Sequence, residues 1–324
     1  MLEAYCDESQ ADMLGKPLLC LAAYLAPDER WHAFSDEWRR EILEPFSIPY
    51  LHAVEFRNLR TSLYRHLDVV SRRRLLGQAC AIVTAHVDAG FVTYLRPDDL
   101  KALTTPVERS RWGGAYGICV ELLLSMMSNH LGRPDRVNIY LEAGHANTAA
   151  ALQKIANFRS DTEPVEWPEV AEGQFTNDVS REESRMRVSA MRIGTYGSVL
   201  KAASPPSQAA DLFAYLTATS LRNDDDPVYS GSLDQLLTRK PHVLSPWGPA
   251  ALAELVQSLR TVEREWSGDR QGFYQMRKVL HEHGFRSHAL PWGVVVDKGP
   301  QDQMAAEMKA QVEAIRRKVS DPSR

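Results

Sequence analysis

The sequence predicts an α/β protein, because segments with the two-residue periodicity of strands alternate with helical segments up to about residue 222. A length of 324 residues allows one large domain or two ordinary ones, each with a full core. Apolar residues make up 44% of the chain and charged residues 25%, which are globular proportions that indicate neither a disordered nor a fibrous protein.

Charge and cysteine usage favour a cytoplasmic protein. The formal net charge of −4 gives no overall attraction to nucleic acid, so phosphate binding would require a local basic patch. Four widely spaced cysteines without a C-x-x-C pair are typical of reduced thiols: Cys6, Cys20, Cys80 and Cys119. The longest apolar run near the N-terminus, residues 18–26, is about half the ~20 residues that a membrane span requires, so we expect no membrane association.

The first elements are expected to be a hairpin and two helices. Residues 2–7 alternate between two faces and residues 17–27 form a continuous apolar run, which predicts two strands. The polar residues 8–15 between them predict a turn, so the first strand should end at Asp7. Helical periodicity then follows in residues 31–43 and again in residues 71–84.

The middle of the chain continues the alternation. Residues 86–95 predict a strand that ends before Pro97, and residues 107–131 predict one long buried helix. Residues 136–142 alternate as a strand does, and a helix is expected from about residue 147 to 158. A loop rich in Asp, Glu and Pro is expected after it, through residue 174.

A segment whose composition favours a β-strand, residues 185–203, precedes an apolar helix that contains Asp211. Ser204 is a suitable cap for that helix, and Pro205 or Pro206 suits its first turn. The alternation of strand-like and helical segments stops after residue 222, where a polar linker begins. We therefore expect a core domain over residues 1–222 and a mainly helical C-terminal extension over residues 223–324.

The extension is expected to contain helices over residues 249–266, 270–283 and 301–319. The last of these carries a heptad-like apolar stripe, which permits a homodimer or a protein partner. His281 and His283 are expected to be structural residues near a helix end, because no third metal ligand is close in sequence.

Three carboxylates stand out from this pattern. Asp7 and Glu142 each lie on the last residue of a predicted strand, and the ends of parallel neighbouring strands lie ~4.8 Å apart. The crevice beyond such ends is where open α/β sheets bind ligands. Asp211 lies in an apolar helix, where an unpaired buried carboxylate costs several kcal/mol, on the order of the penalty per buried ion.

A cation must therefore compensate Asp211, and two kinds of cation are available. One is a hard metal ion, Mg²⁺ or Mn²⁺, held by the oxygens of Asp7, Glu142 and Asp211, with one or two ions in the site. The other is a buried arginine such as Arg192 in a structural ion pair. The metal interpretation predicts that Asp211→Asn stabilises the metal-free protein, because the substitution relieves burial and repulsion.

The segments "YCDES", "NIYLEAG" and "SQAADLFAY" resemble the Asp-Glu and Gln-x-x-Asp signatures of the bacterial domain-of-unknown-function family 3800. The resemblance spans about residues 1–222. It implies a ribonuclease H-like mixed sheet flanked by helices. It also implies that Asp7, Glu142 and Asp211 are the catalytic and metal-binding acids, with Glu8 and Gln208 completing the signatures.

The resemblance leaves the identity of a fourth acid open, since both Glu55 and Glu183 fit. His52 and Glu55, three residues apart, would share one face of a helix and provide a proton shuttle. Basic residues in two segments are candidate phosphate contacts or ordinary solvated faces: Arg72, Arg73, Arg74, Arg181, Arg185, Arg187 and Arg192.

The function expected from these residues is that of a metal-dependent nuclease or a related phosphodiester-cleaving hydrolase, with DNA, RNA or a nucleotide as the substrate. One alternative is a non-catalytic or partner-dependent effector that keeps the fold, which the acidic net charge favours. Another is a phosphatase similar to the haloacid dehalogenases, with Asp7 as the nucleophile. That family expects Asp-x-Asp, and Ser9 stands where the second Asp should be.

Overall fold

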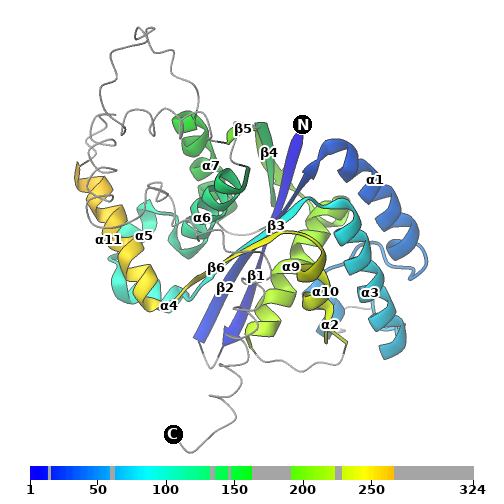
Figure 1. Ribbon diagram of the computed structural model, residues 1–324. Coiled ribbons are helices and arrows are strands. Elements are labelled where there is room, and N and C mark those ends of the chain that lie inside the picture. The colour runs from blue at the N-terminus through cyan, green and yellow to red at the C-terminus, as the bar shows by residue number, and fades with distance from the viewer. Residues whose placement is uncertain are drawn as a thin grey trace, which may run out of the picture.

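The computed structural model describes residues 1–13, 16–58, 63–131, 136–144, 147–162, 191–222 and 228–265. Within these residues the chain forms a six-stranded mixed sheet with the strand order β5-β4-β1-β2-β3-β6 (Figure 1). The strands are β1 (Leu2–Met13), β2 (Lys16–Pro27), β3 (Ala89–Leu95), β4 (Arg136–Glu142), β5 (Arg192–Val199) and β6 (His242–Trp247). The predicted α/β class, with a mixed sheet flanked by helices, is confirmed.

Helices cover both faces of the sheet, and each face has its own apolar core (Figure 1). One layer contains α1 (Asp28–Trp38) with its π-helical continuation Arg39–Leu43, α2 (Ala53–Asn58), α3 (Val69–His86), α9 (Pro205–Leu221) and α10 (Ser232–Arg239). The other contains α4 (Pro97–Leu103), α5 (Pro106–Arg111), α6 (Gly114–Leu131), α7 (Thr148–Thr162) and α11 (Pro249–Glu265). No helix among the described residues is both long and apolar enough to cross a bilayer.

The prediction that β1 ends at Asp7 is wrong. Residues 8–13 stay paired with β2, and the antiparallel register continues to Met13 opposite Lys16. The parallel pairing with β4 does stop at this point, with Cys6 opposite Leu141. Asp7 therefore lies where β1 loses one neighbour and keeps the other.

The prediction of one helix over residues 107–131 is also wrong, because two glycines interrupt it. Gly113 and Gly114 have φ values of 73° and 66°, a left-handed conformation that glycine adopts without the Cβ penalty. Thr105 and Glu108 form a capping box that starts the short helix α5, and α6 begins again at Gly114.

The segment after residue 222 contributes a strand as well as helices. β6 pairs in parallel with β3, from Gly90 opposite His242 to Leu95 opposite Trp247, so the sheet takes its sixth strand from beyond the expected boundary. The predicted helix over residues 249–266 agrees with α11. The expected helices over residues 270–283 and 301–319, and both His281 and His283, lie outside the described residues.

Candidate metal centre

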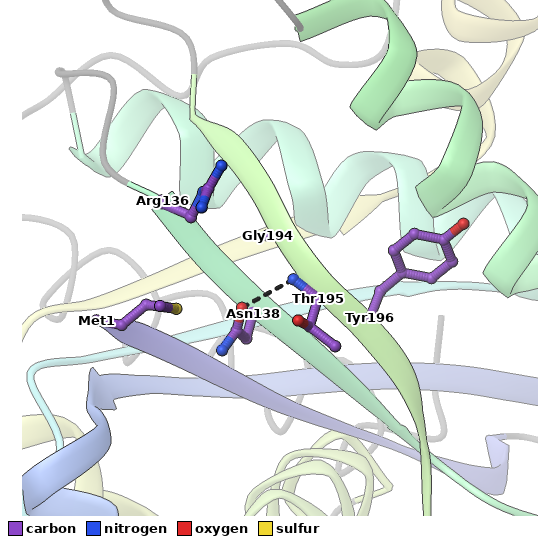
Figure 2. Close-up of a pocket in the computed structure, with 6 residues that line it drawn as sticks. All are labelled: Met1, Arg136, Asn138, Gly194, Thr195 and Tyr196. Atoms are coloured by element: carbon purple, nitrogen blue, oxygen red, sulfur yellow. Dashed lines mark hydrogen bonds between the residues drawn. The ribbon is translucent and has the colours of Figure 1, made fainter.

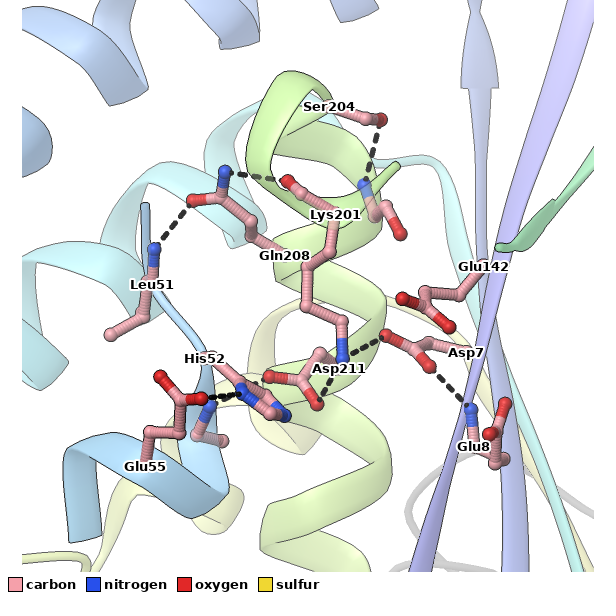
Figure 3. Close-up of polar contacts among 12 residues, drawn as sticks. Asp7, Glu8, Leu51, His52, Glu55, Glu142, Lys201, Ser204, Gln208 and Asp211 are labelled. Atoms are coloured by element: carbon pink, nitrogen blue, oxygen red, sulfur yellow. Dashed lines mark hydrogen bonds and ion pairs between the residues drawn. The ribbon is translucent and has the colours of Figure 1, made fainter. Parts of the chain in front are cut away.

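The pairing of β1 with β4 brings three carboxylates together. These strands are parallel neighbours, as expected, and their register places Asp7 and Glu8 beside Glu142 (Figure 3). One carboxylate oxygen from each side chain lies within 4.8 Å of the others. Asp7 is only 1% exposed, whereas Glu8 and Glu142 are half-buried. Asp7 is therefore the buried carboxylate of the group, and Glu8 and Glu142 are the two that are partly exposed to solvent.

Asp211 reaches the same region from helix α9. Ser204 caps this helix by accepting the Ser207 N–H at 3.3 Å, and α9 packs against β1 and β2. The Asp211 carboxylate is 3% exposed, and its Oδ2 accepts the backbone N–H of Ala53 at 2.7 Å. Asp211 lies outside the group of three carboxylates just described.

The cation that compensates Asp211 in this structure is Lys201, a residue that no sequence pattern predicted for this role. Its Nζ lies 3.1 Å from Asp211 Oδ1 and 2.9 Å from Asp7 Oδ2 (Figure 3). Lys201 belongs to a 3-10 turn, Lys201–Ala203, directly before the cap of α9. Arg192, the suggested partner, is instead an exposed residue at the start of β5.

Burial and neighbouring carboxylates raise the pKa values of three acids in the site. Burial, followed by the charge of Asp211, raises the pKa of Asp7 well above its usual range, although Lys201 opposes the shift. Burial and the charge of Glu142 raise the pKa of Glu8 to about 7. Burial also raises the pKa of Glu142, and Asp211 adds to this shift while Lys201 and His52 reduce it.

Lys201 is held in its charged form. Burial lowers its pKa, but the carboxylates of Asp211 and Asp7 raise it by more, so the net shift is upward. The ammonium is thus a fixed positive charge between two buried acids at neutral pH.

Gln208, the other residue of the helix signature, has a structural role here. Its Oε1 accepts the indole N–H of Trp38 and the backbone N–H of Leu51, each at 2.9 Å. Its Nε2 donates to the carbonyl of Lys201 at 3.0 Å. Gln208 is fully buried and ties both the segment before α2 and the Lys201 turn to α9.

His52 and Glu55 lie together at the start of α2, as their spacing predicts. His52 Nδ1 is 3.5 Å from Glu55 Oε1, and the Tyr50 hydroxyl donates to Glu55 Oε2 at 3.3 Å. His52 directly precedes Ala53, whose N–H donates to Asp211, and Figure 3 shows His52 and Glu55 beside Asp211. Glu183, the other candidate for a fourth acid, lies outside the described residues.

The donor set suits a hard cation. Asp7, Glu8 and Glu142 offer only carboxylate oxygens, and their spacing would let them hold a metal ion. Burial is the largest cause of their raised pKa values and neighbouring carboxylates add to it, and a bound cation would lower each of these pKa values.

A separate cavity of about 510 Å³ lies at the other end of β4 and β5 (Figure 2). It is lined by Met1, Arg136, Asn138, Gly194, Thr195 and Tyr196. The carbonyl oxygen of the Asn138 side chain accepts the Thr195 N–H at 2.8 Å there, which joins the two strands. No carboxylate lines this cavity among the described residues, so the acid chemistry belongs to the carboxyl end of β4.

A scan against protein-family models and a search of curated proteins find no match to this chain.

Proposed function

We propose that the protein is a metal-dependent phosphodiesterase of the nuclease type, which uses Mg²⁺ or Mn²⁺ at the site formed by Asp7, Glu8, Glu142 and Asp211. One observation carries this proposal: the β1–β4 register brings Asp7, Glu8 and Glu142 within 4.8 Å of one another. Two of these carboxylates come from within β1 and one from the end of β4, and carboxylate oxygens are the ligands that Mg²⁺ and Mn²⁺ prefer.

A bound cation of this kind supplies a Lewis acid and lowers the pKa of a coordinated water. The chain supplies the remaining functions. Asp7, Glu8 and Glu142 hold the ion, and Lys201 fixes Asp7 relative to Asp211. His52, oriented by Glu55, is near enough to lower the pKa of Glu142, and we assign it the transfer of a proton at the edge of the site.

Nucleic acid is the proposed substrate, and two lines of support favour it. The order of the Asp-Glu, Glu and Gln-x-x-Asp motifs resembles family 3800, and membership of that family is part of the proposal. A divalent cation held by carboxylates can also activate a water and stabilise the leaving oxygen of a phosphodiester. A cytosolic location belongs to the same proposal, because all four cysteines are buried free thiols.

The test is cleavage of single- and double-stranded DNA and RNA by the purified protein in Mn²⁺, compared with a metal-free blank. Asp7→Asn and Glu142→Gln should each reduce cleavage to the blank. Asp88→Asn should leave cleavage unchanged, because Asp88 is an exposed carboxylate that pairs with Arg30. Equal cleavage by wild type and Asp7→Asn would identify a contaminating nuclease and refute the proposal.

A second candidate is a non-catalytic effector that keeps the fold. The observation in its favour is Lys201, which already compensates the buried Asp7 and Asp211 without a metal. Such a protein would have the same thermal stability with and without Mn²⁺, and it would leave DNA and RNA uncleaved in both conditions. Isothermal titration with Mn²⁺ separates the two candidates, because the effector has no need of the ion.

A further inference from the structure

Lys201 occupies the position that links the strand acid to the helix acid. Its Nζ contacts Asp7 Oδ2 at 2.9 Å and Asp211 Oδ1 at 3.1 Å, and its side chain is 13% exposed. These two carboxylates come from β1 and α9, which are far apart in sequence. In Figure 3 the lysine side chain extends from the start of α9 into the space between them.

The remaining oxygens of both acids are also engaged. Asp7 Oδ1 accepts the backbone N–H of Glu8 at 2.8 Å, and Asp211 Oδ2 accepts the N–H of Ala53 at 2.7 Å. A metal ion that bridged Asp7 and Asp211 would have to displace the ammonium of Lys201. It would otherwise lie beside that like charge in a buried site, where screening is weak.

The backbone of Lys201 is fixed as well. Its carbonyl accepts Gln208 Nε2 at 3.0 Å, and Gln208 is fully buried. The lysine therefore starts from an anchored turn and reaches a buried pair of acids, unlike a solvated side chain that swings away at little cost. Displacement by a metal would leave this ammonium without its two partners.

The other side of Asp7 is different. Glu8 and Glu142 are half-buried, and each offers an oxygen within 4.8 Å of an Asp7 oxygen. No lysine or arginine contact to Glu142 is found in the described part of the chain. The structure thus has one region rich in carboxylate oxygen and one region already filled by a cation.

We propose that the centre binds a single divalent cation through Asp7, Glu8 and Glu142, and that the Lys201 ammonium takes the place of a second cation between Asp7 and Asp211. This inference rests on the proposed metal-dependent function and specifies its stoichiometry. A fixed ammonium cannot dissociate, so the site would keep one of its three positive charges when the metal is absent.

Counting bound Mn²⁺ tests the inference without any measurement of activity. Equilibrium dialysis gives the number of ions per chain, and electron paramagnetic resonance distinguishes an isolated Mn²⁺ from an exchange-coupled pair. Wild type and Lys201→Arg should each bind one isolated ion. Lys201→Met, purified and kept in Mn²⁺, should bind two ions with a coupled spectrum, because the substitution removes the positive charge between Asp7 and Asp211.

Two coupled ions in the wild type would overturn the inference and leave the proposed function standing. No bound Mn²⁺ in the wild type would refute the proposed function, and the inference with it. A single ion in a folded Lys201→Met would show that the space between Asp7 and Asp211 is no metal position. Circular dichroism establishes that this variant is folded, and the wild-type count decides the question by itself if the variant is not.

Discussion

Asp211→Asn is the substitution for which the sequence and the structure predict opposite results. The sequence alone predicts that it stabilises the metal-free protein, since a lone buried carboxylate is a cost. The structure predicts a loss of stability, because Asp211 accepts a charge-assisted hydrogen bond from Ala53 and pairs with Lys201 at 3.1 Å. Both contacts are made by a carboxylate that is 3% exposed.

The magnitude of the loss follows from what remains after the substitution. Removing one partner of a buried ion pair costs about 3–5 kcal/mol when the other charge is left alone. Here Lys201 keeps Asp7 at 2.9 Å, and the amide oxygen of Asn can still accept the Ala53 N–H. We therefore expect a smaller loss of about 2 kcal/mol, which corresponds to a midpoint lower by roughly 4–8 °C.

Thermal unfolding in chelator at neutral pH measures this effect, with Asp88→Asn as the control. Asp88 pairs with Arg30 at the surface, where both side chains are at least 40% exposed, so its loss should change stability by less than about 0.5 kcal/mol. A midpoint for Asp211→Asn at or above that of the wild type would refute the reasoning. That result would mean that Lys201 does not compensate Asp211 and that the acid requires a metal.

Two further predictions concern neighbouring residues. Glu8 has a pKa raised from 4.5 to about 7, so the native state holds its proton more tightly than the unfolded state does. In chelator, the free energy of unfolding of the wild type should therefore fall relative to that of Glu8→Gln as the pH rises from 4.5 through 7. Urea unfolding at several pH values measures both free energies. A constant difference between the two proteins across this pH range would contradict the prediction. Gln208→Leu should cost about 2–4 kcal/mol, because the N–H groups of Trp38 and Leu51 lose their acceptor. Urea unfolding measures this loss against Gln235→Leu, which removes one 3.3 Å bond to Gly77 and should cost less than about 1 kcal/mol.

Local patterns were sufficient to predict the strands and caps that frame the site. The alternation in residues 136–142 agrees with β4, and its last residue is Glu142. Ser204 caps α9 at the predicted position, because a serine followed by prolines suits a helix start. The parallel pairing that the adjacency of Asp7 and Glu142 requires is also present.

Tertiary packing decided the features that the sequence did not predict. Lys201 is ten residues before Asp211 and lies in no recognisable motif, and its contact with Asp7 exists only because α9 packs on β1. β6 is a short segment of six residues that joins the sheet through its pairing with β3. The length of β1 depends likewise on its pairing with β2 beyond Asp7.

A buried carboxylate demands a positive charge, but it does not specify which one. Lys201 meets this demand for Asp211, so that residue alone is no evidence for a metal. The case for a metal comes from the balance of charge around Lys201. Counted over the described residues alone, Asp7, Glu8, Glu142 and Asp211 carry four negative charges when ionised, against the one ammonium of Lys201, an excess of three. Burial is the main cause of the raised pKa values of Asp7, Glu8 and Glu142, and neighbouring carboxylates add to it although Lys201 lowers each pKa. One divalent cation would reduce the excess to a single charge, which is why a site that already contains its own lysine still favours a metal.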